Sequence, residues 1–324
     1  MQSRHPGPGQ LAAVMACALA SGCWAKHVAP AAVQNQPTAT TALETRVANR
    51  DVLAYLPVDM DVVGSVDAEG LRGSMIWAKY LEPGLAGDPA LTRFRETCGF
   101  DPTKTLTRIS FALTTANGVA GGAVVLRGLD RERTLACAAR PHPGPKTSVD
   151  RGVIDWLDDD QHWLIGFADA KTAVMYSSTS LARAQLDAVL ASGAPLRGSP
   201  AFGELFASVD PSATAWFLVN GKAHAFDALA SVAPRPRGVV GAVTLAAGLA
   251  IKVRARMASP ADAATVTAML QSYGASARSM VSRLDVAVED SDATLVVEAT
   301  PDQLGTLAGM MGGVFGGGAG TGTP

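Results

Sequence analysis

Histidine is the residue type that most often carries acid–base catalysis or metal binding, and the body of the chain contains His142, His162 and His224. None lies in an HExxH pattern or beside a cysteine, and no GxSxG, SxxK or Walker A sequence occurs in the chain. The sequence therefore predicts surface or packing roles for these histidines, with no catalytic residue, no metal site and no cofactor. A hydrolase built on this chain would need a site assembled from scattered residues.

Carboxylates gather in one short segment, which could serve acid–base chemistry or bind calcium. A calcium loop needs oxygens at alternating positions and a glycine at its bend, and this segment has neither. We therefore expect a solvated hairpin turn between two strands that carry Trp156 and Trp163. The carboxylates are Asp155, Asp158, Asp159 and Asp160.

A row of cations offers a candidate binding face. From Leu249 to Met257 apolar and basic residues alternate, which predicts a strand with Lys252, Arg254 and Arg256 on its wet face. The row could hold an anionic head group or glycan. Acidic residues of the last two predicted strands could instead form cross-strand ion pairs with it, and they are Asp285, Glu289 and Glu298.

Residues 1–22 have the features of an export signal, with Arg4 before an apolar run from Leu11 to Ala20. The run is too short to span a bilayer, which needs ~20 residues. The sequence Leu19-Ala20-Ser21-Gly22-Cys23 resembles a bacterial lipoprotein signal. This resemblance implies that Cys23 is lipidated and becomes the mature N-terminus, so that the membrane is the partner of the lipid. Ordinary cleavage after Ala20, giving a soluble periplasmic or secreted protein, is the alternative.

The resemblance also implies a location in the cell. In Gram-negative lipoproteins an aspartate after the lipidated cysteine usually signals inner-membrane retention, and here Trp24 follows Cys23. We therefore expect an outer-membrane lipoprotein of the cell envelope. The 27 basic and 29 acidic residues give a net charge of −2, so the chain has no basic field for nucleic acid.

Two cysteines remain in the body of the chain once Cys17 leaves with the signal and Cys23 takes the lipid. In an oxidising envelope Cys98 and Cys137 predict a disulfide, and no CxxC motif or cysteine–histidine cluster favours a metal or redox pair. Cys98 ends a predicted helix just before Gly99, a candidate C-cap. Cys137 lies in a short helical stretch after Asp130. A predicted hairpin between the two helices returns the chain close to its starting edge, which brings the two cysteines together.

The predicted elements make an α+β fold of antiparallel sheets with helices packed on one face. Helix starts are marked by a capping residue followed by proline at Asp88-Pro89, Ser199-Pro200, Ser259-Pro260 and Thr300-Pro301. The longest predicted helix runs from Pro260 to about Arg283, and a further hairpin turn is expected at Asp290-Ser291-Asp292.

We expect a flexible tether over residues 23–49, an ectodomain over 50–311 and a disordered glycine-rich tail over 312–324. Gly87-Asp88-Pro89-Ala90 and Gly198-Ser199-Pro200-Ala201 begin similar stretches, which predicts two related halves, 50–145 and 146–311.

The run Cys98-Gly99-Phe100-Asp101-Pro102, followed by Leu126-Arg127-Gly128-Leu129-Asp130 and Ala136-Cys137-Ala138, resembles a group of uncharacterised envelope lipoproteins from myxobacteria and their relatives. The resemblance covers about a third of the chain. It implies the lipoprotein class and the disulfide but no activity. We expect a non-enzymatic binding, structural or accessory protein whose protein or envelope partner is unknown. The alternatives are the hydrolase and a carrier that holds an apolar ligand between sheet and helices.

Overall fold

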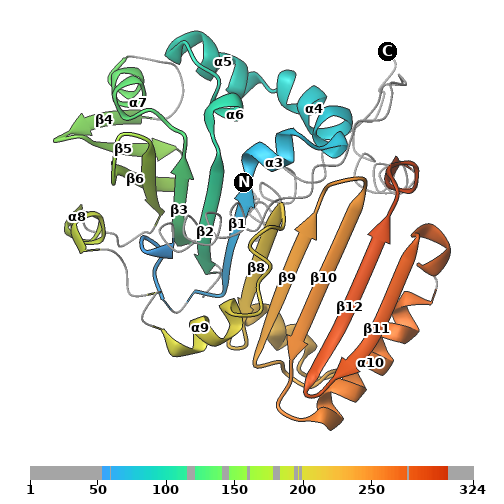
Figure 1. The fold of residues 1–324 in the computed structure, drawn as a ribbon. Helices are drawn as coiled ribbons and strands as arrows, with labels where there is room; N and C mark the ends of the chain where they lie inside the picture. Colours follow the sequence, from blue (N-terminus) through green and yellow to red (C-terminus); the bar gives the residue numbers. More distant parts are fainter. Residues whose placement is uncertain are drawn as a thin grey trace, which may run out of the picture.

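The computed structural model describes residues 53–58, 60–114, 121–140, 146–158, 161–177, 183–192, 196, 199–275 and 277–305. These residues form one 12-stranded sheet in which every neighbouring pair of strands is antiparallel, with helices on it (Figure 1). The predicted α+β class is confirmed. No helix in the described part of the chain is long and apolar enough to cross a membrane. The predicted signal, the tether and the tail lie outside the described residues.

Seven strands come from the first part of the chain and five from the second. The first set is β1 (Val62–Asp67), β2 (Arg108–Thr114), β3 (Gly121–Arg127), β4 (Lys146–Asp150), β5 (Val153–Asp158), β6 (Gln161–Phe167) and β7 (Thr172–Ser177). The second set is β8 (Ala215–Asn220), β9 (Gly238–Thr244), β10 (Leu249–Arg256), β11 (Arg283–Glu289) and β12 (Asp292–Ala299).

The helices are short. They are α3 (Ala68–Arg72), a π-helical turn at Trp77–Leu81, α4 (Glu82–Ala86), α5 (Pro89–Cys98), α6 (Pro102–Thr105), α7 (Arg131–Ala138), α8 (Arg183–Ser192), α9 (Pro200–Phe206), a 3-10 turn at His224–Leu229, α10 (Pro260–Gly274) and a 3-10 turn at Arg278–Met280. The side chains of Asp88, Ser199 and Ser259 accept hydrogen bonds from the first turns of α5, α9 and α10, as predicted. At Thr300 the reciprocal hydrogen bonds of a capping box are formed with Gln303.

The longest helix ends earlier than the sequence indicated. α10 ends at Gly274, and β11 begins at Arg283, where the prediction still had helix. Tyr273 was expected in the buried stripe and is 75% exposed. The apolar residues after Gly274 recur at spacings that suit a helix, but Leu284 and Val286 pair with Val297 and Leu295 of β12. Strand pairing to a distant segment therefore decides the structure of this stretch.

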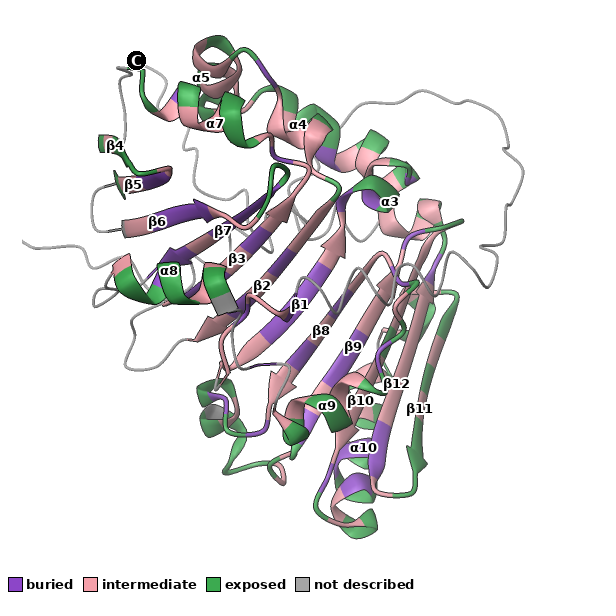
Figure 2. Cartoon of the chain, turned by 60° about the vertical axis from the view of Figure 1, so that its left-hand side comes forward, coloured by how far each residue is buried: buried purple, intermediate pink, exposed green. Residues whose placement is uncertain are grey.

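The helices divide between the two faces of the sheet, whereas the sequence predicted helices on one face only. Val174 and Tyr176 of β7 pack in a core with α8 and α9, whereas Ala173 and Met175 pack in a second core with α5 and α7. Because alternate residues of a strand point to opposite faces, these cores lie on opposite sides of the sheet. α10 packs on the same face as α7, against Ala293 and its neighbours. Figure 2 shows the buried residues concentrated in the central strands.

The strand order repeats. It runs β1-β2-β3-β7-β6 outward from β1 and β8-β9-β10-β12-β11 outward from β8, and β1 pairs with β8 at the centre. In both halves a helix follows the third strand, α7 in one and α10 in the other. The repeat covers residues 62–177 and 215–299, with β4 and β5 additional in the first half. It does not divide at residue 145, because β3 pairs with β7 across that position, and the counterpart of β8 is β1 rather than the strand after α5.

Candidate functional site

The cationic row lies on the face of β10 opposite to α10. Arg254 and Arg256 are in register with Val240 and Gly238 of β9, and Val240 belongs to the core beneath α8 and α9. The row therefore lies on the same face as α9, at the side where β10, β12 and β11 extend past that helix (Figure 1).

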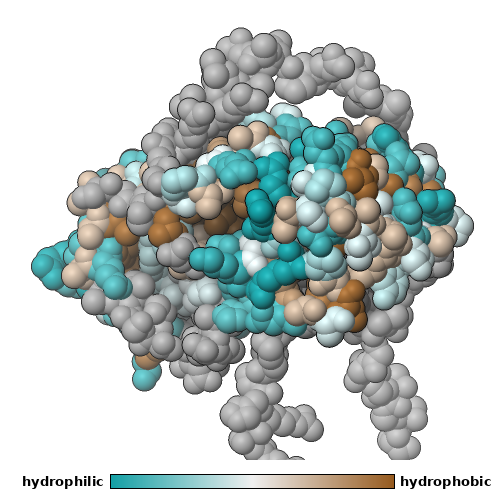
Figure 3. All heavy atoms as spheres, turned by 90° about the horizontal axis from the view of Figure 1, so that it is seen from below, coloured by the Kyte–Doolittle hydropathy of each residue, from teal (hydrophilic) through white to brown (hydrophobic). Residues whose placement is uncertain are grey.

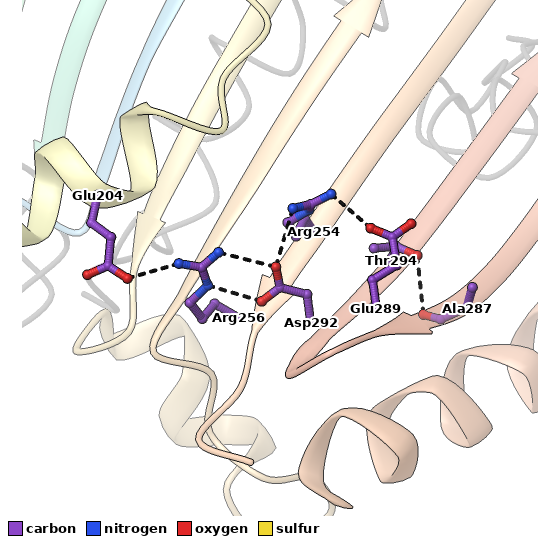
Figure 4. A network of polar contacts seen from close by, with 7 residues as sticks. All are labelled: Glu204, Arg254, Arg256, Ala287, Glu289, Asp292 and Thr294. Carbon is purple, nitrogen blue, oxygen red and sulfur yellow. Dashed lines mark hydrogen bonds and ion pairs between the residues drawn. The ribbon is translucent and has the colours of Figure 1, made fainter. Parts of the chain in front are cut away.

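Ion pairs neutralise most of the row, as Figure 4 shows. Arg256 donates to both carboxylate oxygens of Asp292, through Nε at 3.0 Å and a terminal nitrogen at 3.3 Å, and to Glu204 of α9 at 2.9 Å. These hydrogen bonds, with that to Asp292 the largest contribution, raise the pKa of Arg256. Arg254 donates to Glu289 at 2.9 Å and lies 3.4 Å from Asp292. Lys252 is exposed and has no ion pair with any described residue.

The acidic residues expected to pair with the cationic row are only partly those that do so. Glu289 does pair with Arg254, but Asp285 and Glu298 pair with Arg283, which lies on the same strand as Asp285 and directly opposite Glu298 of β12. The carboxylate that holds the row is Asp292, whose side chain is 8% exposed. Its position at the first residue of β12 places it directly opposite Arg256 of β10, and the cross-strand register explains the bidentate contact.

A cavity of about 320 Å³ lies between α9 and the sheet, beside this network. Its size falls within the range of small-molecule sites, roughly 300–1,000 Å³. The apolar part of its wall is made of Met60, Val63, Leu196, Ala201, Phe202, Leu205 and Leu218, and the polar part of Ser199, Glu204, Asn220, Lys222, Arg237 and Arg256. From this end of the molecule, hydrophobic surface is visible in recesses between hydrophilic side chains (Figure 3).

Local sequence explains how α9 covers the cavity. Ser199 accepts a hydrogen bond from Phe202 N–H and starts the helix, with Pro200 at its first position. Phe202 stacks on Phe206, and Phe206 packs edge-on against Trp216 of β8, 2% exposed. Gly238 lets the helix approach the sheet, because a Cβ there would lie 2.6 Å from a methyl group of Leu205.

The polar wall contains cations from two strand ends. Lys222 follows β8 and Arg237 precedes β9, and these strands are antiparallel, so both residues lie at the same end of the sheet. Neither side chain has a hydrogen bond or ion pair with a described residue. With Arg256 they give three cations against one carboxylate, Glu204, in the wall. The cavity is therefore apolar along its floor and positively charged at its polar end.

The two histidines of the body that the structure describes each lie beside a carboxylate. His162 lies 2.8 Å from Asp155 on neighbouring strands, and His224 lies 3.2 Å from Asp227. Among the described contacts, no serine, threonine or cysteine reaches either imidazole. His142 lies outside the described residues, and the residues that are described contain no cluster of His, Cys, Asp or Glu suited to a metal ion.

The strand pairings of both predicted hairpins and the disulfide are present, while Asp159 and Asp160 of the first predicted turn lie outside the described residues. β5 and β6 pair with Trp156 opposite Trp163, and β11 and β12 turn at Asp290, which has a left-handed φ of 56°. Cys98 at the end of α5 is bonded to Cys137 in α7, with the two Cα atoms 4.9 Å apart. The disulfide joins the two helices that cover one face of the first half.

Sequence reasoning missed the cavity and several of its residues. Glu204 lies on the exposed side of a short helix, and Lys222 and Arg237 are single charges beside turns, so no periodic pattern marks them. Asp292 was assigned to the turn before the last strand. The alternation of β10 was the one usable signal, because it identified Arg256 at the edge of the cavity.

Comparison with known proteins gives a fold but no family. No family model and no curated protein sequence matches the chain. The crystal form III structure of TP0453 matches with a TM-score of 0.52 and 10% sequence identity, over 80% of this chain and 98% of that one. Crystal form I of TP0453 covers 80% of this chain and 97% of its own at a TM-score of 0.49 and 10% identity. The chain is thus similar to TP0453 in its fold.

Proposed function

We propose that this chain is an outer-membrane lipoprotein of the cell envelope, anchored through Cys23, that works by non-covalent binding of a ligand in the cavity beneath α9. The resemblance of Leu19–Cys23 to a bacterial lipoprotein signal supports the anchor. The cavity carries the proposal of binding, because its volume and its combination of an apolar wall with a few polar groups are typical of small-molecule sites.

The apolar floor favours a carrier of a ligand with an apolar part. Val63 and Leu218 are 5% and 3% exposed, and their side chains lie on neighbouring strands facing α9. An apolar group in contact with them leaves water at a gain of roughly 25 cal/mol per Å². Catalysis has no comparable support, because no described nucleophile contacts either described imidazole.

Two experiments test the proposal. The variant Cys23→Ser should move the protein from the membrane fraction to a soluble or unprocessed form, and a protein that is soluble with and without the substitution contradicts the anchor. Binding is tested with the neutral apolar fluorophore N-phenyl-1-naphthylamine, whose emission rises in an apolar site. We expect saturable binding that Ala201→Trp abolishes, because residue 201 lines the cavity.

A matched variant separates filling of the cavity from damage to the helix. Ala207→Trp places the same side chain at the exposed C-terminal end of α9, outside the cavity wall. It should leave binding of the fluorophore unchanged. Equal loss of binding in both variants, or no saturable binding by the unaltered protein, contradicts a ligand site beneath α9.

A further inference from the structure

We propose that the ligand of this cavity is a single-chain amphiphile with an anionic head group, held with its chain against the sheet and its head group at Lys222 and Arg237. This inference rests on the proposed function, since it specifies the chemistry of the ligand in the same cavity. It comes from the separation of apolar and cationic side chains within one wall.

The apolar part of the wall suits a chain rather than a ring system with many polar atoms. Phe202 and Leu205 come from the helix, and Val63 and Leu218 come from the sheet beneath it. A volume of about 320 Å³ equals roughly ten water-sized groups at ~30 Å³ each. A chain of about that many methylene groups fills the cavity without displacing α9.

The cationic end is held in place by the backbone. Gly221 N–H donates to the carbonyl of Arg237 at 3.2 Å, and Arg237 N–H donates to the carbonyl of Arg256 at 2.7 Å. Lys222 N–H donates to Oδ1 of Asn220 at 3.0 Å. These bonds fix the backbone of Lys222 and Arg237 beside the cavity, while the charged groups of the two side chains have no carboxylate partner in the described chain. Both cations are exposed, so a head group could meet them at the mouth.

Glu204 occupies the position of a competing anion. Its carboxylate accepts from Arg256 at 2.9 Å and is 68% exposed, whereas the other partner of Arg256, Asp292, is 8% exposed and accepts two hydrogen bonds. The exposed single contact is the weaker of the two. An anionic head group near Arg256 is therefore repelled by Glu204, and removal of that charge should favour the ligand.

The test compares probes that differ only in the head group. Three probes compete with bound N-phenyl-1-naphthylamine: dodecanoate and dodecylammonium, each below its critical micelle concentration, and dodecan-1-ol below its solubility limit. We expect dodecanoate to displace the fluorophore at the lowest concentration and dodecylammonium at the highest. Each exposed cation contributes up to about fivefold in affinity, so roughly tenfold separates dodecanoate from the alcohol. Added salt should narrow this difference.

Three variants assign the effect to residues. Lys222→Gln combined with Arg237→Gln should weaken dodecanoate binding about tenfold and leave the alcohol unchanged. Glu204→Gln should strengthen dodecanoate binding. Lys252→Gln removes an unpaired cation from the same face of the sheet but outside the cavity wall. It should change the binding of neither dodecanoate nor dodecan-1-ol.

The outcomes distinguish the two proposals. If no probe displaces the fluorophore, or the fluorophore itself does not bind, the proposed function fails. If the carboxylate and the alcohol bind equally and the double variant has no effect, the anionic head group is refuted while binding in the cavity stands. If Lys252→Gln weakens dodecanoate binding as much as the double variant does, the cations act through the general field and not at the cavity.

Discussion

Removal of the Cys98–Cys137 disulfide should lower the free energy of unfolding by about 4 kcal/mol on the chain-entropy model. The bonded residues are 39 positions apart in sequence, and the crosslink forbids the open conformations of that loop in the unfolded chain. Their Cα atoms lie 4.9 Å apart, within the usual range, so the folded state accepts the bond without backbone movement.

Other contacts between α5 and α7 remain when the disulfide is removed. Arg140 donates to the carbonyl of Thr97 at 2.8 Å, and Arg133 donates to the carbonyl of Gly99 at 2.8 Å while its guanidinium lies over the ring of Phe100. The double variant Cys98→Ala, Cys137→Ala should therefore fold. Its lower free energy of unfolding should come from the greater conformational entropy of the unfolded chain.

The assay is urea unfolding of the double variant and of the parent protein, both carrying Cys17→Ser and Cys23→Ser so that no other thiol interferes. Reduction of the parent with dithiothreitol should reproduce the loss, and the double variant should not respond to dithiothreitol. A loss below about 1 kcal/mol would refute the reasoning, because it would mean that the unfolded loop is already restricted. Free thiols at both positions in protein isolated from the envelope would refute the disulfide itself.

Three further predictions concern stability. Gly128→Ala should lower the free energy of unfolding by more than about 1 kcal/mol, because φ is +94° there and a Cβ would lie 2.0 Å from a backbone oxygen. In the control variant Gly203→Ala in α9, the added Cβ has no atom within 4 Å, so stability should be unchanged or higher. Thermal denaturation measures both. Arg254→Gln should lower the free energy of unfolding by ~0–1 kcal/mol. Asp292→Ala should lower it by more, because Arg256 then loses its buried partner. Equal losses of stability in urea unfolding would contradict the network. Burial would raise the pKa of Asp101, but hydrogen bonds from Thr103 and the charge of Arg95 outweigh it and lower the pKa. Its contribution to stability is therefore present above about pH 4 and lost as the pH falls further, so Asp101→Asn should flatten the acid limb of a stability–pH curve.

Local signals predicted much of the fold. The helix starts at Asp88-Pro89, Ser199-Pro200 and Ser259-Pro260 were predicted correctly, because the cap and the fixed φ of proline act within a few residues. The limits of β10 were predicted to within one residue from its alternation. The end of α10 was missed, since the residues after Gly274 take their structure from β12 and not from their neighbours in sequence.

The site was less accessible to sequence reasoning for a physical reason. The cavity is a property of packing between α9, β8 and the segment at Met60, which are up to 160 residues apart in the chain. The charge of Arg256 was visible as part of a row, but its neutralisation by Asp292 depends on the register of two strands. A periodic pattern identifies which face a residue occupies and not which distant residue covers it.

The central pairing of β1 with β8 has a consequence for synthesis. β1 is complete at Asp67, but β8 begins at Ala215, so nearly 150 residues must follow before the first half gains its partner. Until then β1 is the open edge of a seven-stranded sheet, with unpaired amides and carbonyls available to any other extended chain. A chain arrested before residue 215 should consequently need a holding chaperone or associate with other chains, and the same edge allows two complete copies to exchange their second halves.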